Sequence, residues 1–135
     1  MKDFVLDAHL ERECFALGRL HNCRLLLMNN AAVPWFLVVP ETSAIEVYEL
    51  EPSTHNDIIA AIRKLSLFIK AHFAATKINV ASIGNIVPQM HWHVVGRRPD
   101  DYCWPGVVWG TQPPARYTTT RVDEIRALVA AHCLG

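Results

Sequence analysis

Two histidines and a glutamine alternate with apolar residues in one short stretch, and these three side chains could do chemistry. Residues 89–95 read QMHWHVV, with glycine, asparagine and proline before them and Gly96 after them. Alternation of this kind, with β-branched residues at its end, predicts a β-strand. Because side chains alternate between the two faces of a strand, Gln89, His91 and His93 share one face. The large apolar residues between them face the core.

Four interpretations of this polar row follow from the residue types. The row is the polar outer face of a half-exposed strand, a metal site, a pH sensor or a site of nucleophilic catalysis. His-x-His offers two nitrogens to zinc, copper or iron, but nothing nearby has the spacing of a Cys/His cluster. Imidazole titrates near neutral pH, although no other feature supports a sensor. In nucleophilic catalysis, one imidazole attacks an electrophile while its neighbours fix its tautomer or stabilise the developing charge.

The stretch resembles the signature of the histidine-triad (HIT) family, in which three histidines alternate with apolar residues after a Gly-Gln or Gly-Asn loop. His91 and His93 match the second and third histidines, and Gln89 stands where the first is expected. The resemblance covers roughly residues 10–110 in the family's order. Its other blocks are LLLMNN at 25–30, PWFLVVP at 34–40, KINVA at 77–81 and the tryptophan-rich stretch 101–110.

The resemblance implies one HIT-like α+β domain over residues 1–135, with about five antiparallel strands, one long helix and short terminal helices. It also implies a homodimer. The expected activity is that of a nucleotide hydrolase or transferase, in which His91 attacks the α-phosphorus to give a nucleotidyl-histidine. A dinucleoside polyphosphate or a nucleoside phosphoramidate is the expected substrate, and no metal or cofactor is required. His93 would hold a phosphate oxygen or the charge of the intermediate.

The resemblance also points to contacts with the substrate. Backbone N–H groups around Gly84 and Asn85 would cradle phosphate oxygens, and Asn29 and Asn79 would contact the nucleotide. Each asparagine is equally well explained as a polar residue at a turn or strand end. Gln89 forms hydrogen bonds but cannot shuttle a proton as imidazole does. It therefore either restricts turnover to easier leaving groups or serves only to orient.

Two further functions remain open on the sequence. One is a nucleotide-binding module that keeps the pocket but has little turnover. The other is a metal-dependent enzyme that uses His91 and His93 as ligands.

Composition excludes several partners. The 135 residues suit one domain, and 13 basic residues balance 13 acidic ones. This balance argues against duplex nucleic acid or an anionic membrane as a partner. No apolar run is as long as a membrane span, and the first residues lack the features of a signal peptide, so a cytoplasmic location is expected. The four cysteines form no Cys-x-x-Cys pair, so reduced thiols are expected.

Apolar periodicity locates the elements that must position this row. Apolar residues recur at steps of three and four between Ile58 and Phe73, and this stripe predicts a helix of about twenty residues. Thr54 and Asp57 resemble a capping box at its start. The other expected elements are helices over 8–15 and 120–134, a hairpin of strands 24–28 and 35–39, and a strand over 78–81 that pairs with the histidine strand.

A segment rich in tryptophan and proline follows the histidine strand over residues 98–114. Such a composition suits packing over another surface better than a regular element. In the family a comparable segment lies near the subunit contact and the active site, which favours that role here. Arg97 and Arg98 either reach the distal phosphates of a polyphosphate or are simple surface charges.

Overall fold

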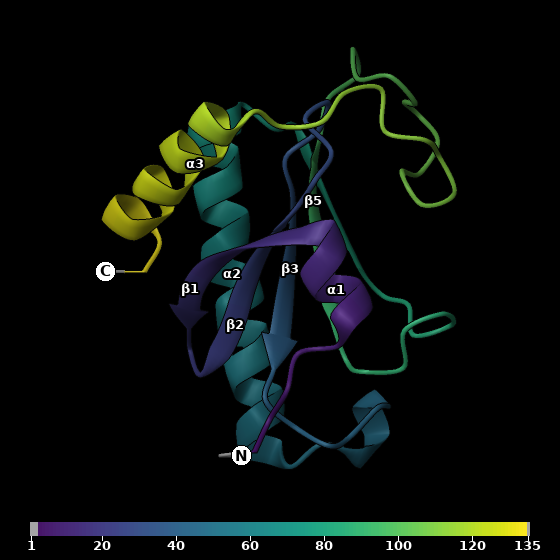
Figure 1. The fold of residues 1–135 in the computed structure, drawn as a ribbon, viewed down its shortest axis with the longest axis vertical. Helices are drawn as coiled ribbons and strands as arrows, with labels where there is room; N and C mark the ends of the chain where they lie inside the picture. Colours follow the sequence, from purple (N-terminus) through teal and green to yellow (C-terminus); the bar gives the residue numbers. More distant parts are fainter. Residues whose placement is uncertain (1–2, 135) are drawn as a thin grey trace.

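A five-stranded antiparallel sheet organises the fold (Figure 1). The computed structural model describes residues 3–134. The strand order is β1-β2-β3-β5-β4, which confirms the expected α+β architecture. The strands are β1 (Cys14–Leu20), β2 (Cys23–Met28), β3 (Trp35–Pro40), β4 (Lys77–Ser82) and β5 (Trp92–Arg97).

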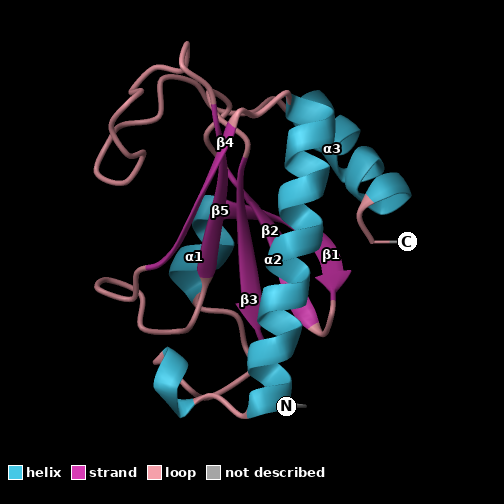
Figure 2. Cartoon of the chain, turned by 180° about the vertical axis from the view of Figure 1, so that it is seen from behind, coloured by secondary structure: helices cyan, strands magenta, loops and turns pink. Residues whose placement is uncertain are grey.

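The long helix α2 (Pro52–Phe73) lies across one face of this sheet (Figure 2). It begins two residues before the expected start at Thr54, and the capping box of Thr54 with Asp57 is wrong. Glu51 is the N-cap and Pro52 occupies the first turn, where its fixed φ suits a helix and its missing N–H has no cost. Helix α2 ends at Phe73, and its C-cap Ala74 adopts the left-handed conformation. Among the described residues, no helix is both long and apolar enough to cross a membrane.

The main core lies between α2 and the sheet. Fully buried residues of the helix, such as Leu65 and Ile69, pack on Phe36 and Val94 of the two central strands. Each large aliphatic side chain buried in this way stabilises the fold by about 1.5–3 kcal/mol. Helix and sheet approach so closely that a Cβ at Gly96 would lie 2.6 Å from Ile69 Cγ2. The glycine near the end of β5 is therefore a packing requirement.

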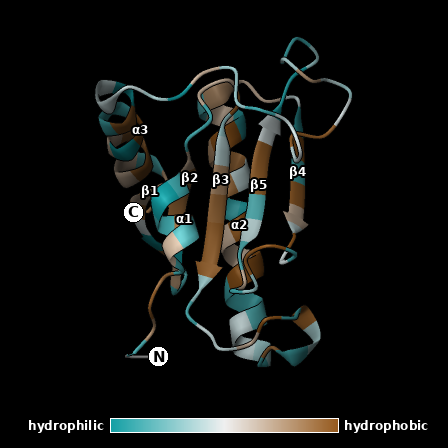
Figure 3. Cartoon of the chain, turned by 45° about the vertical axis from the view of Figure 1, so that its right-hand side comes forward, coloured by the Kyte–Doolittle hydropathy of each residue, from teal (hydrophilic) through white to brown (hydrophobic). Residues whose placement is uncertain are grey.

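The opposite face of the sheet carries two smaller apolar clusters. One joins Leu10 of helix α1 (Ala8–Glu13) to Leu26, Leu37, Val39 and Val87. The other consists of Val33, Trp35, Val95 and Val108. In Figure 3, β3 is hydrophobic along its length, whereas α1 carries hydrophilic residues as well. The chain therefore buries both faces of β3. The face of the sheet opposite α2 is also the face on which His93 of the neighbouring strand β5 lies.

Strand β1 was not located from the sequence. The helix expected over 8–15 ends at Glu13, and the chain enters β1 at the next residue. The pairing of β1 with β2 shifts between Ala16 and Gly18, and Gly18 has φ +128°. This bulge interrupts the alternation by which a strand is recognised. Helix α3 (Thr119–His132) lies close to the expected 120–134, but its cap is Thr118, whose hydroxyl accepts from the backbone N–H of Arg121.

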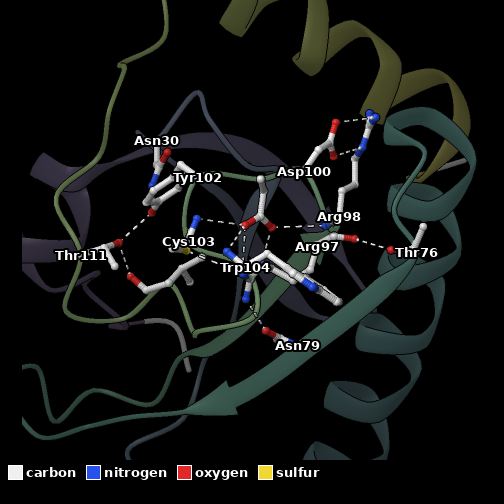
Figure 4. Close-up of polar contacts among 12 residues, drawn as sticks. Asn30, Thr76, Asn79, Arg97, Arg98, Asp100, Tyr102, Cys103, Trp104 and Thr111 are labelled. Atoms are coloured by element: carbon white, nitrogen blue, oxygen red, sulfur yellow. Dashed lines mark hydrogen bonds and ion pairs between the residues drawn. The ribbon is translucent and has the colours of Figure 1, made fainter.

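Arg97 at the end of β5 is buried, so neither expectation for it is correct. Its side chain is 2% exposed and forms a two-pronged ion pair with Asp101, with Nε to Oδ2 at 2.7 Å and Nη2 to Oδ1 at 3.1 Å (Figure 4). Nη1 donates to Asn79 Oδ1 at 2.9 Å. Asp101 also accepts from the backbone N–H groups of Cys103 and Trp104. The pair thus fastens the beginning of the tryptophan-rich segment to the sheet. Arg98, by contrast, is exposed and pairs with Asp100.

We predict that Asp101→Asn lowers the free energy of unfolding by about 3–5 kcal/mol at neutral pH, because it leaves a buried guanidinium without its anion. Hydrogen bonds from Arg97 lower the pKa of Asp101 from 3.8 to about 2. A depressed pKa contributes stability that is fully present above the unfolded value and is lost as pH falls toward the folded value. The deficit of the variant should therefore shrink between pH 4 and pH 2. Denaturant unfolding of both proteins at several pH values measures this difference in stability.

Asp100→Asn is the matched control for this experiment. Asp100 is 70% exposed and pairs with the half-exposed Arg98, so its loss should change stability by less than about 1 kcal/mol. Equal effects of the two substitutions would contradict the structural role assigned to the buried pair.

Candidate active site

A cavity of about 410 Å³ opens on the face of the sheet opposite α2. Its walls come from helix α1, from the strands β2, β3 and β5, from the loop 83–87 and from the segment 108–111, which are distant from one another in the sequence. His91 and His93 both line it, although each is only 5% exposed. The fold therefore brings the two histidines together at the base of a partly enclosed site.

The ring of His91 is fixed by the backbone. His91 Nδ1 lies 2.7 Å from the carbonyl oxygen of Gln89. Because a carbonyl oxygen can only accept, Nδ1 carries the proton and donates it. The neutral ring then has its lone pair on Nε2, which is the form that a nucleophile requires. The expected contact with a backbone carbonyl is present.

The ring of His93 is fixed in the opposite tautomer. Trp35 Nε1–H donates to His93 Nδ1 at 3.0 Å, and both side chains are buried. An indole N–H can only donate, so Nδ1 of His93 is an unprotonated acceptor and the proton of the neutral ring is on Nε2. His93 therefore offers a hydrogen-bond donor where His91 offers a lone pair.

Aromatic rings surround His93. Its ring centroid lies 5.7 Å from that of Trp35, 5.5 Å from that of Trp109 and 5.0 Å from that of His91. Burial first, and the neighbouring His91 second, lower the pKa of His93 from 6.5 to about 3. His93 is thus neutral throughout the physiological range, and it can donate a hydrogen bond to an anion without itself becoming a cation.

Gln89 does not share the row with the histidines. Regular pairing of β5 begins only at Trp92, so strand alternation does not extend back to residue 89. Gln89 is absent from the described residues that line the cavity. Its side chain instead bonds the N-terminal segment, with Oε1 accepting from the Asp7 N–H at 2.8 Å and Nε2 donating to the Val5 carbonyl at 2.9 Å. This placement corrects the expectation of one continuous polar face. Met90, Trp92 and Val94 do pack toward the main core, as expected.

The four expected substrate-binding residues are not all at the site. Asn85 lines the cavity, and Gly84 precedes it without lining the cavity itself. A Cβ at Gly84 would make only ordinary contacts, so the turn does not require glycine. Asn29 Oδ1 accepts from the backbone N–H of Tyr117 at 2.9 Å, and Asn79 accepts from Arg97. Both asparagines therefore have structural partners away from the cavity.

Several lining residues were not identified from the sequence. His9 and Glu13 of α1, Trp35 of β3 and Thr111 of the tryptophan-rich segment all line the cavity. His9 and Glu13 are four residues apart, which places them on one helix face, and this spacing was the available signal. To place Trp35 at the cavity, the register of β3 against β5 must be known. The tryptophan-rich segment was expected near the active site and the subunit contact, and its residues Val108 to Thr111 line the cavity.

The cavity is lined mostly by apolar and neutral groups. Among the described residues that line it, there is no lysine or arginine, and the carboxylate is Glu13. Glu13 Oε1 lies 3.5 Å from His9 Nε2, and the two side chains are about half exposed. Within residues 3–134, no group of three or more His, Cys, Asp or Glu side chains is arranged to hold a metal ion.

Comparison with known proteins identifies the family. The HIT domain model matches residues 9–100, which is more than half of the chain, so this protein belongs to the HIT domain family. A histidine-triad protein from Sinorhizobium meliloti 1021 has the same fold, with a TM-score of 0.93, 34% identity and 98% coverage of both chains. One from Marinobacter aquaeolei VT8 has a TM-score of 0.91, 36% identity and 98% coverage of both chains.

A curated relative carries a more specific name. The chain is 28% identical over 71 residues to the bis(5'-nucleosyl)-tetraphosphatase [asymmetrical] of Schizosaccharomyces pombe. The match covers 49% of this chain and 39% of that protein. The matched stretch is thus well under half of the relative's length.

We predict that Trp35→Phe releases the tautomer of His93. The variant removes the Nε1–H donor, so His93 Nδ1 becomes free to carry the proton and a mixture of tautomers results. The free energy of unfolding should fall by about 1–3 kcal/mol, because a buried acceptor loses its partner. Nitrogen-15 NMR of the imidazole rings should show a single Nε2–H form in the native protein and both forms in the variant.

Trp109→Phe is the matched control. Trp109 also contacts His93, but its indole Nε1 has no hydrogen-bond partner within the described part of the chain. This variant changes an aromatic neighbour without removing a bond to His93, so the Nε2–H form should persist. A single unchanged tautomer in Trp35→Phe would contradict the assignment.

Proposed function

We propose that this protein is a nucleotide hydrolase or nucleotidyltransferase that cleaves a nucleoside phosphate linkage through a nucleotidyl-histidine intermediate on His91. The observation that carries the proposal is the hydrogen bond from His91 Nδ1 to the Gln89 carbonyl. It holds the neutral ring in the tautomer whose Nε2 carries the nucleophilic lone pair. An imidazole held in line with phosphorus replaces one difficult displacement by two easier ones.

His93 supports this chemistry as a neutral donor. The Nε2–H that the Trp35 hydrogen bond implies would hold a phosphate oxygen as charge develops on it. Burial and His91 keep the pKa of His93 near 3, so the ring retains this form at neutral pH. Backbone N–H groups of the loop around Asn85, which lines the cavity, are the other candidates for phosphate contacts. Gly84 adjoins them.

The electrostatics of the cavity favour a substrate with few phosphates. A dinucleoside tetraphosphate carries several negative charges, which protein sites usually balance with arginine, lysine or a metal ion. The lining described above offers no arginine or lysine and includes Glu13. We therefore rank a nucleoside phosphoramidate, with one phosphate, above a dinucleoside polyphosphate. The similarity to the Schizosaccharomyces pombe tetraphosphatase keeps the polyphosphate as the competing substrate.

The alternative function is a nucleotide-binding module with little turnover. The placement of Gln89 favours it, because the position of the first triad histidine holds an amide that is bonded to Val5 and Asp7. A metal-dependent site built on His91 and His93 fits the geometry less well. The Trp35 bond puts a proton on the Nε2 of His93 that would have to ligate the metal.

We predict that His91→Ala lowers release of adenosine monophosphate by more than about 1,000-fold, as expected when a nucleophile is removed. Release should be measured from an adenosine phosphoramidate and from diadenosine tetraphosphate, with excess chelator present. The native protein should release adenosine monophosphate from the phosphoramidate. Release from diadenosine tetraphosphate should be slower or absent.

The matched control is His55→Ala. His55 is an exposed histidine in the first turn of α2 and does not line the cavity. Its loss should leave release unchanged. Binding of adenosine monophosphate without release by the native protein would favour the binding module. Activity that the chelator abolishes would favour a metal-dependent enzyme.

We also propose that the protein forms a homodimer through the outer edge of β4. Strands β1 and β4 are the two edges of the sheet, and an edge strand presents unpaired backbone groups to a partner. Strand β1 is interrupted by its bulge and contacts α3. Strand β4 is regular and exposes Val80.

We predict that light scattering coupled to size exclusion gives the mass of two chains for the native protein and of one chain for Val80→Lys. A lysine at this edge introduces charge into the proposed contact. Leu67→Lys is the control, because Leu67 is a 71% exposed residue of α2 away from this edge. A single-chain mass for the native protein would overturn the proposed dimer.

A further inference from the structure

We propose that His9 of helix α1 protonates the leaving group, and that Gln89 acts as the strut that positions this helix at the cavity. The inference rests on the proposed function, because a leaving group departs only if His91 attacks. It assigns to the N-terminal helix the proton transfer that an amide at the first triad position cannot perform.

Both polar atoms of the Gln89 side chain bond the N-terminal segment. Its oxygen accepts from the backbone N–H of Asp7, and its nitrogen donates to the backbone carbonyl of Val5, across more than eighty residues of sequence. Both bonds have good lengths, 2.8 and 2.9 Å. Gln89 thus ties the approach to α1 to the loop that precedes the histidine strand.

Helix α1 is fixed at its N-terminus and along the face that packs on the sheet. The Asp7 side chain accepts from the backbone N–H of His9 at 2.8 Å and so caps the helix. Leu10 is 3% exposed and packs with Leu37 and Val87 on the sheet. His9 and Glu13, one turn apart, consequently lie at the cavity wall on one face of the helix.

The other two imidazoles of the cavity and its threonine hydroxyl already have roles or partners. His91 is the nucleophile, and His93 is held as a neutral donor by Trp35. The Thr111 hydroxyl donates to the Val108 carbonyl at 2.6 Å. His9 is the remaining imidazole among the described lining residues, and Glu13 forms an ion pair with it whenever it is protonated.

The proposed cycle balances in both steps. In the first, the lone pair of His91 Nε2 forms a bond to phosphorus while the bond to the leaving group breaks. The leaving atom keeps the bonding pair and takes a proton from the His9 imidazolium. In the second step, neutral His9 accepts a proton from a water molecule while the oxygen of that water bonds to phosphorus. The bond from phosphorus to His91 Nε2 breaks, its electron pair returns to the nitrogen, and His9 is again protonated.

Two substrates that differ in their leaving group test this role. An alkylamine phosphoramidate of adenosine monophosphate needs a proton on its departing nitrogen, whereas its 4-nitrophenyl ester releases a stable anion. We expect His9→Gln to lower the ratio of the amine rate to the nitrophenolate rate by about 100-fold or more, the usual effect of losing a general acid. His55→Gln, an exposed histidine outside the cavity, is the control and should keep the native ratio.

Gln89→Ala separates positioning from catalysis. It should lower the same ratio, because helix α1 loses its tie, but it should lower the ratio little further in the His9→Gln background. A structural defect alone would instead reduce both rates in proportion. Circular dichroism of each variant confirms that the fold is kept, as expected for the partly exposed His9.

The outcomes distinguish this inference from the proposed function. Release of nitrophenolate that depends on His91, with a native ratio in His9→Gln, overturns the role of His9 and leaves the hydrolase intact. Additive effects of His9→Gln and Gln89→Ala overturn the strut. Absence of release from both substrates in the native protein overturns the proposed function and this inference together.

Discussion

The register of β3 against β5 is the constraint on which the site depends. Trp35 is opposite Val95 and Leu37 is opposite His93, so the indole and the imidazole lie on one face of adjacent strands. A slip of one residue would turn His93 toward α2, where the core is apolar, and would turn Trp92 toward the cavity. Packing of Phe36, Val38 and Val94 against the helix on the other face makes such a slip costly. The hydrophobic core of one face thus sets the chemistry of the other.

Within that register, two identical side chains acquire opposite roles through their Nδ1 partners. A backbone carbonyl makes Nδ1 of His91 a donor, and an indole N–H makes Nδ1 of His93 an acceptor. Their rings are 5.0 Å apart and inclined at 72°. Burial first, and the neighbouring His91 second, lower the pKa of His93 to about 3, so this ring is a neutral donor. A lone pair beside an N–H suits attack on phosphorus, since one group forms the bond while the other receives the growing negative charge.

Local patterns in the sequence predicted most of the elements and placed the two histidines next to each other, whereas the five-stranded sheet was implied by the family resemblance. The α2 stripe, the β2–β3 hairpin and the antiparallel pairing of β4 with β5 all follow from periodicity and short connections. What could not be predicted depends on contacts between distant segments. Strand β1 contains a bulge at Ala16 to Gly18, and the burial of Arg97 depends on Asp101 folding back onto it. Gln89 departs from the row because the chain is not yet in β5 at that residue, and its partners lie more than eighty positions away.

The N-terminal segment therefore belongs to the site as well as to the fold. If Gln89 faced the cavity, the approach to α1 would lose two hydrogen bonds to the loop before β5, and α1 carries His9 and Glu13 of the cavity wall. The amide supplies the acceptor and the donor that these two backbone contacts require, from an oxygen and a nitrogen on the same carbon atom. The bonds of Gln89 to the N-terminal segment thus have a structural role that is independent of any part in the chemistry. If His9 acts as proposed, the same amide also helps to set the position of the titratable group.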